Sequence, residues 1–172
     1  MFSIETLTAP EARELLPSLV ALLQDIVNGG ASIGFVPPLD TKTAERYWLS
    51  TITEVANGER VLLVSREANI VTGSVQLALS TKQNGLHRAE VQKLLVHTQF
   101  RGRGMGRALM FEVEEAASHS GRTLLVLDTE QGSIAEKLYL THGYQRVGVI
   151  PQYALAANGS LTSTVVFYRV LG

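Results

Sequence analysis

Residues 89–107 read Ala-Glu-Val-Gln-Lys-Leu-Leu-Val-His-Thr-Gln-Phe-Arg-Gly-Arg-Gly-Met-Gly-Arg. The first nine of these residues are rich in apolar and β-branched side chains, which predicts a strand that is buried on at least one face. Three glycines then occupy alternate positions, and an apolar stripe at helical spacing runs from Met105 to Ala117. The pattern predicts a strand, a glycine-rich loop and a helix in immediate succession.

A loop of this kind is suited to binding a phosphate group. The first main-chain N–H groups of a helix have no partner, the helix dipole favours negative charge, and glycine lets a ligand approach the backbone closely. Arginine supplies forked donors for phosphate oxygens, and Arg101, Arg103 and Arg107 lie among the glycines. The spacing matches neither the Walker loop nor the dinucleotide fingerprint, because no lysine follows the glycines and position 107 is not glycine. A tight turn with solvated arginines is the alternative interpretation.

Composition narrows the classes of function. The chain has 172 residues, of which 45% are hydrophobic and 18% charged, and we expect a single domain over residues 1–172. A formal net charge of −1 argues against nucleic-acid binding, because phosphate contacts require a basic surface. There is no cysteine, and the four histidines show no zinc-ligand spacing, so we expect no metal site.

The N-terminus lacks the basic and then apolar pattern of a signal peptide, and no apolar run approaches membrane-spanning length. We therefore expect a cytoplasmic protein with no membrane partner.

The remaining chain is expected to alternate strands and helices. Capping patterns predict helix starts at Thr8, Asp40 and Ser133, and residues 31–38 form a shaped loop. The predicted strands cover residues 2–7, 60–66, 70–79, 89–97, 123–128, 144–150 and 162–171. The succession of strand, helix and strand over residues 89–128 predicts a parallel pair within a mixed α/β sheet. Ligands bind beyond the carboxyl ends of such strands, where the glycine loop begins and where Asp128 is expected to end its strand.

Two motifs carry a family resemblance. Arg101-x-x-Gly104-x-Gly106 resembles the coenzyme A pyrophosphate signature of the GNAT N-acyltransferases, and Ala135-x-x-Leu138-Tyr139-x-x-x-Gly143-Tyr144 is similar to a second pattern of that family. Within the family, residues 29–35, 84–94 and 127–133 resemble the tabtoxin-resistance acetyltransferases. The resemblance covers essentially the whole chain. It implies a GNAT-like three-layer α/β fold, with a mixed central β-sheet and a parallel central strand pair flanked by helices.

The resemblance also implies acetyl-CoA as cosubstrate and an activity. The acetyl group would pass by direct attack to the amine of a small amino-acid-like molecule, such as a β-lactam toxin of the tabtoxin type. The residues expected to bind acetyl-CoA are Leu94, Leu95, Val96, Arg101, Gly102, Arg103, Gly104, Met105, Gly106, Arg107, Ser133 and Lys137. One departure is that Gly132 stands where the family often has asparagine; either Ser133 replaces its contact or the contact is absent.

The expected catalytic residues are two carboxylates and a phenol. Glu90 and Asp128 lie on neighbouring predicted strands, so that one can take the proton of the amine while the other holds the cationic substrate. The alternatives are a salt bridge from Glu90 to Arg88 or Lys93, and a turn cap at Asp128. Tyr139 matches the family tyrosine that donates a proton to the departing thiolate; its alternative role is packing.

Three further residues, Ser32, Phe35 and Glu130, are expected to touch the substrate. Two other functions stay open at this point: a non-catalytic acyl-CoA-binding module, and an N-acetyltransferase for peptide or protein amines. The family is often dimeric, so a homodimer is a further expectation from the resemblance.

Overall fold

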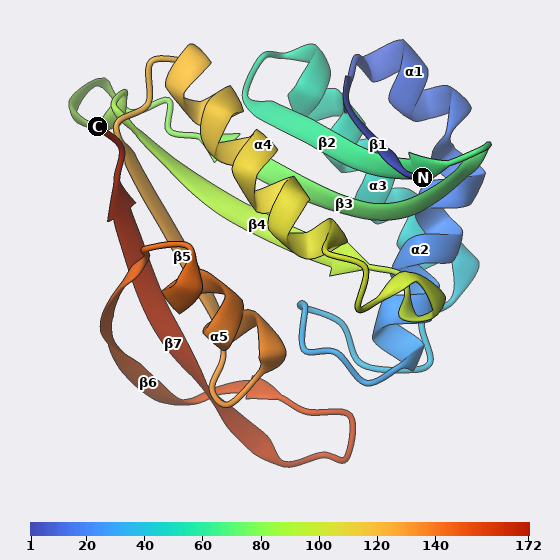
Figure 1. The fold of residues 1–172 in the computed structure, drawn as a ribbon. Coiled ribbons are helices and arrows are strands. Elements are labelled where there is room, and N and C mark those ends of the chain that lie inside the picture. Colours follow the sequence, from blue (N-terminus) through green and yellow to red (C-terminus); the bar gives the residue numbers. More distant parts are fainter.

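The centre of the molecule is a seven-stranded mixed sheet in the order β1-β2-β3-β4-β5-β7-β6 (Figure 1). The computed structural model describes residues 1–172. The strands are β1 Ser3–Leu7, β2 Arg60–Glu67, β3 Ile70–Leu79, β4 Arg88–Val96, β5 Leu124–Glu130, β6 Gln145–Leu155 and β7 Leu161–Val170. Only β4 and β5 pair in parallel, and every other pair of neighbours is antiparallel. The expected mixed sheet with a parallel central pair is confirmed.

Helices cover both faces of this sheet. They are α1 Ala9–Glu14, α2 Leu16–Asn28, α3 Thr41–Ala56, α4 Met105–His119 and α5 Ile134–Thr141. The first three pack on one face over β2, β3 and β4, and α4 and α5 pack on the other (Figure 1). Because successive strand residues face opposite sides, Leu62 and Val64 belong to the first core, whereas Leu63 belongs to the second. The result is the expected three-layer arrangement.

The helix starts follow their capping residues. The main-chain N–H of Thr8 donates to Oε2 of Glu11 at 2.7 Å, and Oδ1 of Asp40 accepts from the N–H of Thr43 at 2.9 Å. At α5 the hydroxyl of Ser133 accepts from the N–H of Glu136 at 3.2 Å, as predicted. The Glu136 carboxylate, however, accepts from the N–H of Gly132 and does not close the box on Ser133.

Two strand ends differ from the prediction. β5 does not end at Asp128 but continues to Glu130, because Thr129 and Glu130 pair with Val165 and Thr164 of β7. β6 continues past Ile150 to Leu155, with a register shift between Ile150 and Ala154. Both extensions carry polar residues or proline, which weaken a sequence-based strand prediction. The longer β5 places Asp128 inside a strand, where its direction is fixed by the alternation of side chains.

The central strands part beyond their first three paired residues. β4 pairs with β5 only from Arg88 to Glu90, opposite Leu124 to Val126. On its other edge β4 has a bulge against β3, with a register shift between Ser74 and Gln76 and a positive φ of 50° at Lys93. The bulge reverses the alternation of β4, so that Val91 faces α4 but Leu95 packs with α2. None of the helices has both the length and the apolar character that crossing a bilayer requires.

Candidate active site

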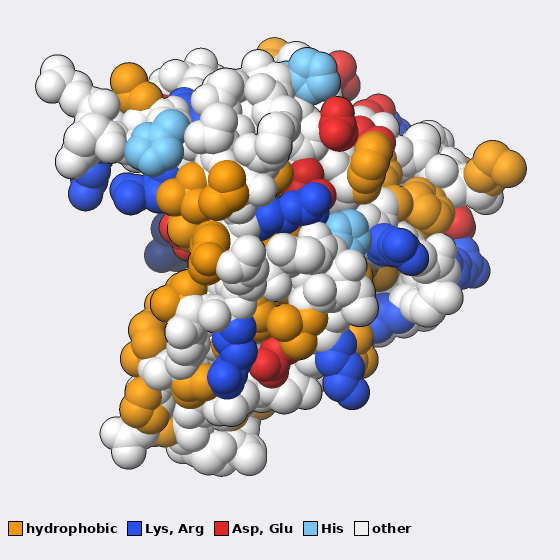
Figure 2. All heavy atoms as spheres, turned by 60° about the vertical axis from the view of Figure 1, so that its left-hand side comes forward, with side chains coloured by type: hydrophobic (Ala, Val, Ile, Leu, Met, Phe, Trp, Pro, Cys, Tyr) orange, Lys and Arg blue, Asp and Glu red, His pale blue; other side chains and the backbone are white.

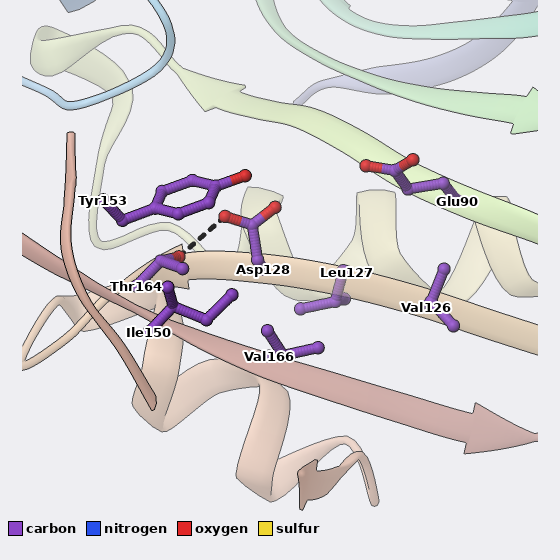
Figure 3. A pocket seen from close by; sticks show the side chains of 8 residues that line it. All are labelled: Glu90, Val126, Leu127, Asp128, Ile150, Tyr153, Thr164 and Val166. Atoms are coloured by element: carbon purple, nitrogen blue, oxygen red, sulfur yellow. Dashed lines mark hydrogen bonds between the residues drawn. The ribbon is translucent and has the colours of Figure 1, made fainter. Parts of the chain in front are cut away.

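A cleft opens beside the point where β4 and β5 part. It has a volume of about 130 Å³ and is lined by Glu90, Val126, Leu127, Asp128, Ile150, Tyr153, Thr164 and Val166 (Figure 3). On β5 and β7, Val126, Asp128, Thr164 and Val166 alternate with residues of the α4 and α5 core, namely Leu125, Leu127, Val165 and Phe167, of which only Leu127 also borders the cleft. The cleft therefore lies on the opposite face, the side on which α1, α2 and α3 cover the other half of the sheet.

The two predicted carboxylates line this cleft together. Glu90 comes from β4 and Asp128 from β5, and their side chains extend into the same space (Figure 3). Oδ2 of Asp128 accepts a hydrogen bond of 2.6 Å from the hydroxyl of Thr164 on β7, so Asp128 does not cap a turn. Glu90 forms no ion pair, so the predicted alternative of pairing with Arg88 or Lys93 is not realised. The arrangement gives one oriented carboxylate and one that is free to accept a proton or a cation.

Tyr139 lies on α5 with its ring in the second core. It is 6% exposed, and its ring centroid lies 5.8 Å from that of Tyr144 and 6.1 Å from that of Phe167. Burial raises the pKa of the Tyr139 phenol, and the negative charge of Asp128 raises it further. The phenol therefore stays protonated at neutral pH. Of the two tyrosine hydroxyls here, that of Tyr144 is fully enclosed without a hydrogen-bond partner.

The glycine loop presents main-chain donors without acceptors. No main-chain hydrogen bond in the loops or helix caps is donated by the N–H groups of residues 101–107. Gly102 and Gly104 have φ of 77° and 76°, and a Cβ atom added at either would meet nothing within 4 Å. A negatively charged group can therefore approach these N–H groups at the start of α4, as the sequence predicts.

The three arginines of this loop have different surroundings. Nε of Arg101 donates to the carbonyl oxygen of Val96 at 3.2 Å. The guanidinium of Arg103 pairs with Glu67 at 3.0 Å and lies 5.2 Å from the ring centroid of Phe100. Arg107 is exposed and has neither a hydrogen bond nor an ion pair. Of the three, Arg107 is thus the guanidinium most available to an anion.

None of the remaining predicted residues lines the cleft. Leu94 and Val96 pack toward the α4 core from the parted segment of β4, and Leu95 is buried on the other face. The Ser133 hydroxyl caps α5 and lies 3.2 Å from that of Thr129, while Lys137 is exposed on α5. Ser32 and Phe35 belong to the loop over residues 31–38, and Glu130 is the last residue of β5.

Two hydroxyl-bearing residues of the cleft, Tyr153 and Thr164, were not predicted from the sequence, and neither were its apolar lining residues. Tyr153 follows Pro151 in the irregular part of β6, where Gln152 has a positive φ of 54°, and its ring lies beside Asp128 (Figure 3). A proline within a strand marks a bulge that redirects the next side chains, and this was the available signal. Thr164 gave no local signal, because its role depends on the register between β5 and β7.

The cleft is continuous with an apolar surface. Figure 2 shows hydrophobic side chains gathered along the lower part of the molecule, where the β6–β7 hairpin lies. The exposed large hydrophobic residues of these strands are Val147, Val149, Ile150, Tyr153, Leu155, Leu161 and Val170. Ile150 and Tyr153 also line the cleft, so one of its walls is apolar.

Comparison with known proteins places this geometry among acetyltransferases. The model of the acetyltransferase (GNAT) domain family matches residues 57–146, which is just over half of the chain. A protein of Azospirillum brasilense, described as an uncharacterized N-acetyltransferase in the hisH–hisA intergenic region, is 31% identical over 130 residues, covering 74% of this chain and 73% of the relative.

Solved structures share the fold. A ribosomal-protein-alanine N-acetyltransferase from Brucella melitensis superposes with a TM-score of 0.81 at 23% identity, covering 98% of this chain and 99% of that one. The yncA protein from Salmonella typhimurium, solved with its cofactor acetyl-CoA, gives a TM-score of 0.78 at 18% identity, covering 100% of this chain and 95% of the other.

Proposed function

This chain belongs to the GNAT family of acetyltransferases, and on that premise we propose that it transfers the acetyl group of acetyl-CoA to the amine of a small amino-acid-like molecule. The observation that carries the proposal is the cleft in which Glu90 and Asp128 face one space where β4 and β5 part. When bound, acetyl-CoA supplies an activated acetyl group as a thioester. The residues of this chain bind, orient and exchange protons around it.

The residues of the glycine loop fit such a donor. The unpaired N–H groups at Gly102, Gly104 and Gly106 suit a pyrophosphate, and Arg107 adds an available guanidinium. The parted edge of β4 near Leu94 and Val96 leaves main-chain groups that can pair with amides, as an added strand would. We assign Arg101, Arg103, Met105, Ser133 and Lys137 to the surroundings of the same ligand.

The two carboxylates divide the work on the amine. An amine reaches the site as ammonium and must lose a proton before it attacks. Asp128, held by the hydroxyl of Thr164, is suited to orienting the ammonium, and Glu90, which has no partner, is suited to accepting the proton. Holding the amine in reacting geometry supplies much of the acceleration, and no covalent enzyme intermediate is needed.

Tyr139 acts as the proton donor in this proposal. Its phenol is protonated at neutral pH, as any tyrosine of ordinary or raised pKa is, and this is the proton that it would give to the departing thiolate. Removal of the hydroxyl in Tyr139→Phe distinguishes this role from packing alone.

The acceptor we propose is a compact amino-acid-like amine, with a β-lactam of the tabtoxin type as the specific candidate. The cleft, about 130 Å³ in volume, can hold the amine end of such an acceptor, and the loop that carries Ser32 and Phe35 and the end of β5 at Glu130 would complete its surroundings.

The test is a thiol-release assay with acetyl-CoA and a panel of α-amino acids that includes β-lactam amino acids. We expect acetylation of at least one acceptor, and a decrease in kcat/KM of about 10²- to 10³-fold for Glu90→Gln. Glu112→Gln, at an exposed position of α4, is the matched control and should leave the rate unchanged. Binding of acetyl-CoA without acetylation of any amine would favour the non-catalytic acyl-CoA-binding module.

A further inference from the structure

Lys93 occupies an unusual backbone position at the edge of the parted strands. It lies in the bulge of β4 and has a φ of 50°. This is the left-handed region of backbone conformation, which residues other than glycine and asparagine rarely adopt. Such a conformation is strained and persists only where the surroundings impose it. A bulge redirects a side chain, and here it sends that of Lys93 toward α3.

The side chain of Lys93 is partly buried, and no counter-charge contacts its ammonium. Nζ lies 5.8 Å from the ring centroid of Tyr47 on α3, and 3.7 Å from where a Cβ atom of Gly34 would stand. The group thus reaches from β4 to the loop over residues 31–38 and lies at van der Waals distance from the Cβ position of residue 34. No hydrogen bond or ion pair is formed by this partly buried lysine.

The surroundings of Lys93 act on the pKa of its ammonium in opposite directions. Burial lowers the pKa of its ammonium and the positive charge of Arg60 lowers it further, whereas the negative charges of Asp128 and Glu90 act in the opposite direction. Arg60 is itself paired with Glu54 at 2.7 Å. A desolvated cation without a partner binds an anion more strongly than a hydrated one does.

We propose that Lys93 binds the carboxylate of the acceptor while the amine of the same molecule lies between Glu90 and Asp128. This inference rests on the proposed function and extends it by naming the charge pattern of the substrate, which is a zwitterion, and the residue that selects it. The ammonium of an amino acid then meets Glu90 and Asp128 in the cleft, and its carboxylate reaches beyond the cleft lining to Lys93, further along β4. Lys93 is a specificity residue in this proposal and has no part in the proton transfers.

The experiment compares amino acids with their own α-carboxamides, which keep the amine and lack the negative charge. Wild-type protein should prefer the amino acid in kcat/KM by about 10-fold or more, because a charge-assisted hydrogen bond to the carboxylate is lost in the carboxamide. Lys93→Met should lower kcat/KM for the amino acid by about 10- to 100-fold and leave that for the carboxamide within about two-fold. Lys82→Met, at an exposed position of the turn before β4, is the matched control.

A binding measurement separates this proposal from the proposed function. Calorimetry with the protein saturated with coenzyme A should show amino-acid binding that Lys93→Met weakens. If this binding is seen but no acetyl transfer is found, the proposed function fails and the role of Lys93 stands. Acetylation without a preference for the carboxylate would overturn the role of Lys93 alone. A weaker affinity of Lys93→Met for acetyl-CoA would overturn it too, because it would place Lys93 on the donor. The role of Lys93 would also be overturned if no amino acid of the panel bound to the protein.

Discussion

The hydroxyl of Thr164 donates a hydrogen bond of 2.6 Å to Oδ2 of Asp128, across the pairing of β7 with β5. Thr164 is 3% exposed, and its hydroxyl also lies 2.9 Å from the carbonyl oxygen of Thr129. The contact makes the two carboxylates of the cleft unequal, since Glu90 on the other wall has no such donor. The side chain of Asp128 therefore has a fixed orientation. The side chain of Glu90 can rotate, and both of its carboxylate oxygens are available to accept a proton or a hydrogen bond.

The first prediction concerns a variant that lacks this hydrogen bond. Thr164→Val keeps the shape of the side chain and frees the Asp128 carboxylate, so the KM of the amine should rise by about 3- to 10-fold. The KM of acetyl-CoA should not change. Steady-state kinetics with each substrate varied in turn provide the measurement, and Thr162→Val, two residues earlier on the same face of β7, is the control. An equal loss in both variants would show that the contact does not orient Asp128.

The second prediction concerns the two neighbouring tyrosines. Tyr139→Phe should lower kcat by about 10²-fold or more and leave acetyl-CoA affinity unchanged, because the variant removes only a proton donor. Tyr144→Phe is the matched control: its hydroxyl is buried without a partner, and burial followed by the charge of Glu114 raises its pKa. The loss of this hydroxyl should be neutral or slightly stabilising. Similar turnover in the two variants would assign Tyr139 to packing.

The third prediction tests the anion site at the start of α4. Gly104→Ala adds a methyl group in the space that an anion would occupy and strains a residue with a φ of 76°. Acetyl-CoA should bind about 10-fold or more weakly by calorimetry. Gly121→Ala is the control, because Gly121 has a φ of 71° and open space around its Cβ position but follows the other end of α4. Equal effects of the two variants would mean that strain, and not the ligand, accounts for the loss.

The sequence predicted the elements well because local signals specify them. The glycines at 102, 104 and 106, the capping residues Thr8 and Ser133 and the apolar run of β5 each act through their own neighbours in the chain. These signals also predicted the parallel pairing of β4 with β5 and the helix α4 that connects the two strands. They placed Glu90 and Asp128 on adjacent strands, which was enough to bring both to one cleft.

What the sequence did not predict depends on register and on bulges. The contact between Thr164 and Asp128 follows from the pairing of two distant strands, and Tyr153 reaches the cleft only through the irregularity of β6. The bulge at Lys93 has no glycine or proline to mark it, although it reverses the alternation of β4. Its cause is tertiary, so a reading of local propensity cannot find it.

The last prediction concerns the stability cost of Lys93. Its pKa in the folded state is below the ordinary lysine value, so between the two values the unfolded chain binds more protons and the free energy of unfolding rises with pH. Below the folded pKa the protein carries the full penalty of an enclosed ammonium, which a cation–π contact with Tyr47 offsets only in part.

Lys93→Met should therefore raise the free energy of unfolding by about 1 kcal/mol at pH 7, as residues kept for function often lower stability. The advantage over wild type should shrink as the pH rises toward the ordinary lysine pKa of about 10.4, because the folded chain releases this proton at a lower pH than the unfolded chain does. Urea unfolding at pH 7 and at about pH 10 measures the difference, with Lys82→Met as the exposed control. If the variant is less stable than wild type at pH 7, Lys93 stabilises the fold. The proposal that Lys93 is an unpaired cation that binds the carboxylate of the acceptor would then fail.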